Sequence, residues 1–274
     1  MAWVSFDVFR TLGFADTLQL KASQLLARRQ DLADAEWVLF PEYWQLNALV
    51  YGLNARVFPS EASYRLGHNK IEMTRAFELV APAHIPWTEI RANTPENAEE
   101  LWALMQSPFV AKLPKSALGN GVWLIEDRQE WKTYVATTDV LYVQEYLPID
   151  RDIRVVVVGD QVISAYWREQ ASRGFYNNVA KGGAIDHSPV PQIAVDLALN
   201  LAKTLGIDHA GFDIAMVAGH PYVLEFNRLF GNQGITGGGG AVRDAIVDYL
   251  HRQSTPTGPS FPSNPANHRL SRVA

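Results

Sequence analysis

The sequence predicts an α+β fold, in which antiparallel hairpins and helices follow one another along the chain. Two pairs of β-rich runs carry this prediction: residues 152–158 with 162–167, and residues 212–217 with 222–226. Each pair is joined by a short glycine-containing segment, as expected of a β-hairpin. A helical stretch that ends at Gly206 separates the two hairpins, so the pattern differs from the strand–helix alternation of a doubly wound sheet.

Residues 1–60 predict a small α/β unit. Leucines and alanines at helical spacing, without a helix breaker, predict a helix over residues 15–32. Short apolar runs at 37–40 and 56–58 predict buried strands, with a helical segment at 43–53 between them. This order is similar to a βαβ unit.

Helices and short strands continue along the rest of the chain. Asn69 can cap the start of a helix over residues 69–81. Residues 254–274 carry four prolines with several serines and asparagines, a composition typical of a disordered tail. The remaining expected elements are helices at 96–106, 127–136, 191–205 and 241–253 and strands at 109–112, 121–126 and 141–145.

The composition is that of an ordinary globular protein with a substantial core. Of its 274 residues, 47% are hydrophobic and 19% are charged. The net charge of −5 argues against nucleic acid or an anionic membrane as a partner. We expect no membrane-spanning helix and no secretory leader. The absence of cysteine excludes disulfides and zinc–thiolate sites and fits a cytoplasmic location.

The first candidate site is a lysine next to a glycine-bearing loop. Lys112 ends an apolar run, and Gly119 and Gly121 follow in the next loop. Glycines let backbone amides approach a polyphosphate, and the lysine adds a positive charge. The alternative is a plain hairpin loop with a solvated lysine.

A second candidate is the strand end that contains Glu145 and Tyr146. A carboxylate and backbone groups can read the edge of an adenine, while apolar side chains cover its face. The alternative is an ordinary edge strand.

The third candidate is a set of hard oxygen donors on the second hairpin. Glu225 and Asn227 are two residues apart and share one face of a strand, and Asp213 lies on the paired strand. Such donors suit Mg²⁺ together with substrate phosphates. The alternative, a polar outer face, conflicts with the apolar residues that surround them, because buried carboxylates without a cation are costly.

The fourth candidate is a basic and polar cluster that could neutralise a transferring phosphoryl group. Its individual members could equally be solvated surface residues. Asp152 lies two residues from Arg154 and points the same way. No nucleophilic triad is present, and His209 and His220 are expected in turns. The cluster comprises Arg154, Arg168, Asn177, Asn178, Lys181, Gly182 and Gly183.

The order of these groups is more specific than any one of them. It runs from the lysine strand and glycine loop through the Gln-Glu-Tyr strand and the Asp-Ile-Arg hairpin to Gly-Phe-Asp and Leu-Glu-Phe-Asn. This order resembles the ATP-grasp superfamily, and most closely its RimK-like carboxylate–amine ligases. The resemblance covers about residues 57–235. It implies an ATP-grasp domain over 61–253, with subdomains of about 69–145 and 146–253 that clamp ATP, behind a truncated unit at 1–60.

The resemblance also implies roles for particular residues. Basic residues that match those near the substrate and the acyl-phosphate are Arg154, Arg168 and Lys181. Residues that match nucleotide contacts are Lys70, Lys112, Gly119, Gly121, Glu145, Tyr146, Asp152, Asn177 and Asn178. Residues that match the ligands of two Mg²⁺ ions, for which Mn²⁺ can substitute, are Asp213, Glu225 and Asn227.

The implied reaction is ATP-dependent ligation through an acyl-phosphate, with ADP and phosphate as products. The partners would be a small-molecule or peptide carboxylate and an amine such as an amino acid, and the enzyme could be a homo-oligomer. The alternatives are a small-molecule kinase of the same fold and a non-catalytic nucleotide-binding module. Three departures from the family bear on the substrate: Tyr176 in place of an arginine, Arg-Leu-Phe at 228–230, and four glycines at 237–240.

Overall fold

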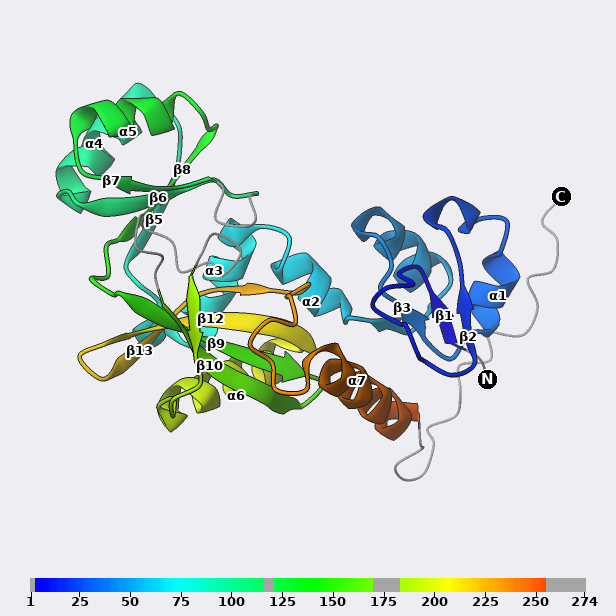
Figure 1. Ribbon diagram of the computed structural model, residues 1–274. Coiled ribbons are helices and arrows are strands. Elements are labelled where there is room, and N and C mark those ends of the chain that lie inside the picture. The colour runs from blue at the N-terminus through cyan, green and yellow to red at the C-terminus, as the bar shows by residue number, and fades with distance from the viewer. Residues whose placement is uncertain (1–2, 116–120, 170–182, 255–274) are drawn as a thin grey trace, which may run out of the picture.

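The computed structural model describes residues 3–115, 121–169 and 183–254, and these residues form three β-sheets with helices on their faces (Figure 1). Two of the sheets are antiparallel and one is parallel, which confirms the predicted α+β class. Most of the expected tail at 254–274 lies outside the described residues. Within the described part, no helix combines the length and apolar character needed to cross a membrane.

The N-terminal unit is a small parallel sheet in the order β2-β1-β3-β4. The single helix expected over residues 15–32 is wrong, because residues 17–19 pair with β1 as a parallel strand. Leu25 and Leu32 instead contribute to the core of this unit. Its elements are β1 (Trp3–Ser5), β2 (Thr17–Gln19), η1 (Ala22–Gln24), α1 (Arg29–Asp34), β3 (Val38–Leu39), η2 (Tyr43–Gln45), η3 (Ala48–Gly52) and β4 (Val57–Phe58).

The second sheet is antiparallel, in the order β5-β8-β6-β7, and α4 and α5 pack against it. Thr94 and Asp127 cap these two helices by accepting hydrogen bonds from backbone amides of the first turn. The elements are β5 (Thr88–Ala92), α4 (Pro95–Met105), β6 (Phe109–Lys112), β7 (Val122–Ile125), α5 (Arg128–Val135) and β8 (Val140–Glu145).

The third sheet is the centre of the molecule and has the order β11-β10-β9-β12-β13. Val155 and Val157 of β9 face a core with α3 and α6, whereas Val156 and Val158 face a core with α7 and the N-terminal unit. The elements not yet given are α2 (Glu61–Leu66), α3 (Lys70–Val80), η4 (Pro82–His84), β9 (Arg151–Val158), β10 (Gln161–Glu169), β11 (Ala184–Asp186), α6 (Gln192–Leu205), β12 (His209–Val217), β13 (His220–Asn227) and α7 (Gly238–Ser254).

Helix α7 joins the N-terminal unit to the five-stranded sheet (Figure 1). Ile246 and Leu250 of α7 share a core with Phe40 and Phe58 of the N-terminal unit. At the end of α7, the Trp37 indole donates a 3.1 Å hydrogen bond to the Ser254 hydroxyl. This second core therefore places the N-terminal unit against one face of the sheet.

Two glycines in hairpin turns provide a matched test of this packing. A Cβ at Gly159 (φ +63°) would lie 2.3 Å from Tyr249 Cδ2, whereas Gly219 (φ +80°) has no neighbouring atom within 4 Å. We expect Gly159→Ala to lower the free energy of unfolding by about 2–5 kcal/mol, from backbone strain plus a clash, and Gly219→Ala by only about 1–2 kcal/mol. Urea denaturation measures the free energy of unfolding of both variants. Equal losses of stability would contradict close packing of α7 against the turn that contains Gly159.

Candidate active site

Four charged side chains form a buried cluster on one face of the five-stranded sheet. Asp152 and Arg154 come from β9, Arg168 from β10 and Asp213 from β12. Arg154 is directly opposite Asp213, and Asp152 is opposite Arg168. Directly opposed residues share a face, so the strand register brings the four together. None of them is more than 8% exposed.

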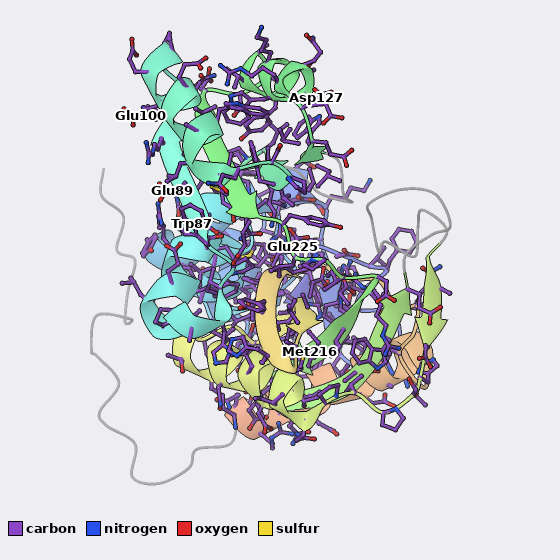
Figure 2. All side chains as sticks on the ribbon, turned by 90° about the vertical axis from the view of Figure 1, so that its left-hand side faces the viewer. Trp87, Glu89, Glu100, Asp127, Met216 and Glu225 are labelled. Carbon is purple, nitrogen blue, oxygen red and sulfur yellow. The ribbon has the colours of Figure 1, made fainter. Side chains whose placement is uncertain are left out.

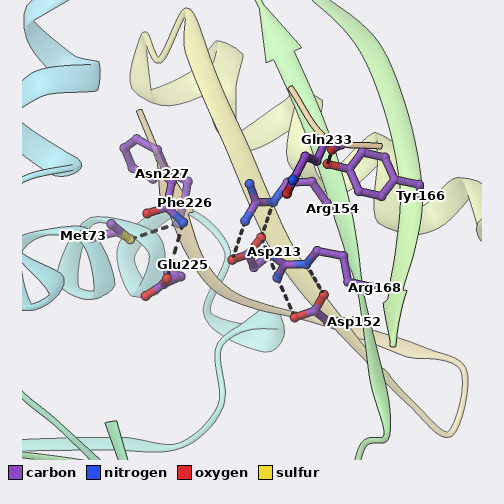
Figure 3. Close-up of polar contacts among 10 residues, drawn as sticks. All are labelled: Met73, Asp152, Arg154, Tyr166, Arg168, Asp213, Glu225, Phe226, Asn227 and Gln233. Carbon is purple, nitrogen blue, oxygen red and sulfur yellow. Dashed lines mark hydrogen bonds and ion pairs between the residues drawn. The ribbon is translucent and has the colours of Figure 1, made fainter. Parts of the chain in front are cut away.

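The cluster is held by charged hydrogen bonds between arginines and aspartates (Figure 3). Arg154 binds Asp213 through Nε–Oδ1 at 2.6 Å and Nη2–Oδ2 at 3.1 Å. Arg168 binds Asp152 through two bonds of 2.7 Å, and its Nη2 lies 3.0 Å from Asp213 Oδ1. Arg168 therefore bridges both carboxylates, and two cations offset two anions.

The arginines keep Asp213 ionised despite its burial. Burial alone would raise the pKa of this carboxyl, but Arg154 and Arg168 outweigh it and hold the pKa below its ordinary value. In the same way, burial opposes the charge of Arg168, yet Asp213 and Asp152 raise the pKa of this guanidinium. Asp213 and Arg168 therefore stay charged although both are buried, whereas burial raises the pKa of Asp152 above its ordinary value.

A second ion pair involves Glu225, which lies where the four-stranded and five-stranded sheets meet (Figure 2). Lys70 Nζ, at the start of α3, lies 3.1 Å from Glu225 Oε2. Asn227 Nδ2 donates a 3.5 Å hydrogen bond to Glu225 Oε1. Glu225 is opposite Asp213 in the sheet, so the three predicted metal ligands lie on two adjacent strands.

The Asp213 carboxylate is nevertheless bound by the two arginines (Figure 3). Among residues 3–115, 121–169 and 183–254, no three His, Asp or Glu side chains form a metal-binding group. Glu225 and Asn227 are thus brought together as predicted, while Asp213 is held by Arg154 and Arg168.

Lys112 is buried at the end of β6, on the side of the four-stranded sheet. Its Nζ donates a 2.7 Å hydrogen bond to Gln144 Oε1, and Gln144 Nε2 donates one of 2.8 Å to Thr88 Oγ1. Burial lowers the pKa of Lys112 to about 8, although Glu225 opposes this shift. Lys112 therefore carries a proton that is easily lost at mildly alkaline pH.

Glu145 ends strand β8 and is tied to the segment before β5. Its Oε1 accepts a 2.7 Å hydrogen bond from the Trp87 amide, and its own amide donates one of 2.9 Å to the Trp87 carbonyl. Tyr146 follows directly in the chain. The two residues expected to contact adenine thus lie at the end of β8, where the chain leaves the four-stranded sheet and continues to β9.

The loops expected to cover the phosphates are described only in part. Gly121 adopts φ +76°, and its carbonyl accepts a 2.7 Å hydrogen bond from the Leu113 amide. This conformation favours glycine at the point where the loop re-enters β7. Five predicted site residues lie outside the described residues: Gly119, Asn177, Asn178, Lys181 and Gly182.

The chain matches the RimK-like ATP-grasp domain over residues 70–250. This is a RimK-like ATP-grasp protein. Over 223 residues it is 32% identical to a protein named probable alpha-L-glutamate ligase from Enterobacter sp. (strain 638). The aligned region covers 75% of this chain and 74% of that protein. The ribosomal protein bS6–L-glutamate ligase of Salmonella newport (strain SL254) shows the same identity and coverage. The predicted family and ATP-dependent carboxylate–amine ligase class are confirmed.

Solved structures support the ATP-grasp fold beyond the matched domain. A RimK domain ATP-grasp protein from Sphaerobacter thermophilus DSM 20745 superimposes with a TM-score of 0.69 at 17% identity, over 91% of this chain and 99% of that one. D-alanine–D-alanine ligase from Bacillus anthracis complexed with ATP gives 0.69 at 14% identity, over 93% and 99%. The N-terminal unit is therefore within the shared fold, since the superposition covers nearly all of each chain.

Several residues of this ATP-grasp site were not found from the sequence. Gln144 binds Lys112 and is itself bound to Thr88, but in the sequence only their polarity marks these two residues. At Gly211, a Cβ would come within 2.8 Å of Arg154 Nη1, so glycine makes room for the guanidinium. The expectation that His209 and His220 lie in turns is wrong, because they begin β12 and β13 and His209 is fully buried.

Breaking the buried ion-pair cluster should lower the stability of the fold. We expect Arg168→Met to lower the free energy of unfolding by about 3–5 kcal/mol, because Asp152 is left as an uncompensated buried charge. The control is Arg252→Met, which breaks an exposed pair with Asp160 and should cost at most about 1 kcal/mol. Chemical denaturation measures the free energy of unfolding of both variants. If the Arg168 variant loses no more stability than the Arg252 variant, the ion-pair geometry is contradicted.

Proposed function

We propose that ATP binds between the four-stranded and five-stranded sheets, and that its γ-phosphate activates a carboxylate for attack by the amine of an amino acid. The observation that carries this proposal is the convergence of Lys70, Lys112 and Glu225 beside the Arg154–Asp213 cluster. Two lysines can contact the phosphates, while the arginines stabilise the charge that develops during transfer. Relatives named as glutamate ligases make glutamate the first amine to test.

The oxygen donors on β12 and β13 fit Mg²⁺. Glu225 keeps 27% of its side chain exposed, so one face of its carboxylate remains accessible. Asn227 supplies an amide oxygen beside it, and Asp213 can add a third donor by exchanging one arginine contact. When bound, Mg²⁺ or Mn²⁺ would shield the β- and γ-phosphate oxygens. The proposed set of one or two ions rests on this donor chemistry.

The chain itself would act mainly by positioning and by charge. A carboxylate oxygen attacks the γ-phosphorus, the bond to the β–γ bridging oxygen breaks, and ADP leaves. The amine nitrogen then attacks the acyl carbon, phosphate leaves, and the nitrogen loses a proton to solvent. Lys112, Arg154 and Arg168 offset negative charge in the first step, because their own charges are already held in place.

The identity of the products and a substitution of Glu225 test this proposal. We expect ADP and phosphate as products, formed only when both a carboxylate and an amine are present. Glu225→Gln should lower turnover by about 100-fold or more through loss of the metal and phosphate contacts. The matched control, Glu89→Gln, breaks a pair with Arg91 on β5 and should leave turnover unchanged. Formation of AMP, or stimulation by a single substrate as in a kinase, would contradict the ligase proposal.

The pKa of Lys112 predicts how nucleotide binding depends on pH. The pKa is lowered to about 8, so the ammonium is present below that pH and is lost above it. We expect the Kd of a non-hydrolysable ATP analogue with Mg²⁺ to rise by up to about tenfold per pH unit above pH 8. Lys112→Arg should abolish this dependence, because a guanidinium stays protonated. Calorimetric titrations across this range provide the test, and a flat wild-type profile would refute a phosphate contact by Lys112.

A further inference from the structure

One face of the four-stranded sheet is polar although it is buried. Leu141 and Val143 of β8 belong to the core with α4 and α5, so strand alternation turns Tyr142 and Gln144 to the opposite face. Thr88 is directly opposite Gln144 and therefore faces the same side. Tyr142 is 1% exposed and Gln144 is 3% exposed. Because buried polar groups are costly without partners, the contacts of this face decide how the sheet is attached.

The polar side chains of this face form a network around the Lys112 ammonium. Lys112 Nζ donates to Gln144, and Gln144 donates to Thr88, with distances of 2.7 and 2.8 Å. The ammonium also lies 5.8 Å from the centroid of the Tyr142 ring, within reach of a cation–π contact. Burial raises the pKa of Tyr142 to about 12, while hydrogen bonding to Thr74 opposes this rise. The phenol is therefore neutral at physiological pH and keeps its proton for hydrogen bonding.

The Tyr142 hydroxyl connects this network to helix α3. It shares a buried hydrogen bond of 2.8 Å with the Thr74 hydroxyl. Threonine is a poor helix former, and its hydroxyl competes for backbone groups, so local preference does not explain Thr74 in the middle of α3. Its neighbours Met73 and Phe77 pack in the core of the five-stranded sheet. Helix α3 is therefore part of the five-stranded layer, and Thr74 links it to the other sheet.

The same turn of α3 also holds the carboxylate side of the proposed ATP site. Lys70 lies four residues before Thr74, so the two residues are neighbours on one face of the helix. Lys70 Nζ lies 3.1 Å from Glu225 Oε2 on β13. The Lys70 amide donates a 2.9 Å hydrogen bond to the carbonyl of Pro114, two residues after Lys112. A single turn of α3 thus contacts both walls of the proposed site.

We propose that Tyr142 and Thr74 are positioning residues, whose shared hydrogen bond sets the separation between Lys112 on one sheet and Glu225 on the other. The inference rests on the proposed function, in which these two charged groups serve one nucleotide from opposite sides. A polyphosphate and its metal can be contacted from both sides only when the two sheets are held at a fixed spacing. Tyr142 and Thr74 act through Lys112 and do not themselves contact the nucleotide.

The first test is the pKa of Lys112 in the full chain without nucleotide, followed by NMR of its Cε–Hε group. Tyr142→Phe keeps the ring over which the ammonium lies, and Thr74→Val keeps the shape of the side chain, so each variant removes one hydroxyl. Burial lowers the pKa of Lys112 to about 8 in the wild type. Loss of the hydrogen bond admits water, so either variant should raise this pKa toward its ordinary value of about 10.4. The charged groups around Lys112, unchanged in both variants, are Glu225, Lys70 and Asp213.

The second test is the Kd of a non-hydrolysable ATP analogue with Mg²⁺, measured by calorimetry at pH 7. Each single variant should weaken binding by about fivefold, because the two sheets are no longer held in register with the nucleotide. The double variant should bind no more weakly than Tyr142→Phe alone, since both changes remove the same contact. Thr74→Ser keeps the hydroxyl and should restore wild-type binding. The matched controls, which remove exposed hydroxyls elsewhere and should change neither the Kd nor the pKa of Lys112, are Tyr51→Phe and Thr133→Val.

A purely structural role for the Tyr142–Thr74 contact gives a different pattern. It would lower the free energy of unfolding of both variants while the pKa of Lys112 stays at its wild-type value, and that result overturns the inference. Losses of affinity that multiply in the double variant, or a Thr74→Ser variant as weak as Thr74→Val, overturn it as well. If the wild type does not bind the ATP analogue, the proposed function fails, and the pKa of Lys112 in the nucleotide-free protein still decides this inference.

Discussion

Two guanidinium groups and two carboxylates balance one another inside the five-stranded sheet, and the register of its central strands depends on that balance. Arg154 meets Asp213 across β9 and β12, and Arg168 meets Asp152 across β10 and β9. A slip of one residue in either pairing would turn the charges toward the apolar core under α6. Removal of any one partner leaves an uncompensated charge in a site shielded from water. The cluster thus specifies one alignment of three strands.

The same alignment positions the rest of the chemistry. Glu225 is opposite Asp213, and Lys70 reaches it from the first turn of α3. Lys112 approaches from the other sheet, where Gln144 holds its ammonium. Positive charge is therefore gathered at the junction of the two sheets and each group is already oriented by a partner. Little reorganisation is required when a polyphosphate enters, which is the property on which electrostatic catalysis depends.

Strand alternation was enough to predict part of this site from the sequence. Glu225 and Asn227, like Asp152 and Arg154, are two residues apart, and local geometry alone places each pair on one face. Which cation faces which carboxylate could not be predicted, because Arg154 and Asp213 are 59 positions apart and meet only through strand register.

Local patterns failed where tertiary contacts decide. The leucines at 18–32 have helical spacing, yet part of that segment pairs as a strand with β1. His209 follows a glycine-containing turn, so its polarity suggested a loop; its burial among Phe40, Phe58 and Phe230 depends on three segments that are distant in the sequence. The predicted strand began at residue 212, three positions after the true start of β12.

The core shared by the N-terminal unit and α7 has a consequence for biosynthesis. Trp3, Phe40 and Phe58 are translated early, but Val242, Ile246 and Leu250, which cover them, belong to the last helix of the described chain. This apolar surface stays uncovered until α7 has been synthesised. The hydrogen bond from Trp37 to Ser254 joins residues 217 positions apart and can form only after α7 has been made. The apolar surface of the N-terminal unit thus depends on α7, which is made much later, for protection from aggregation.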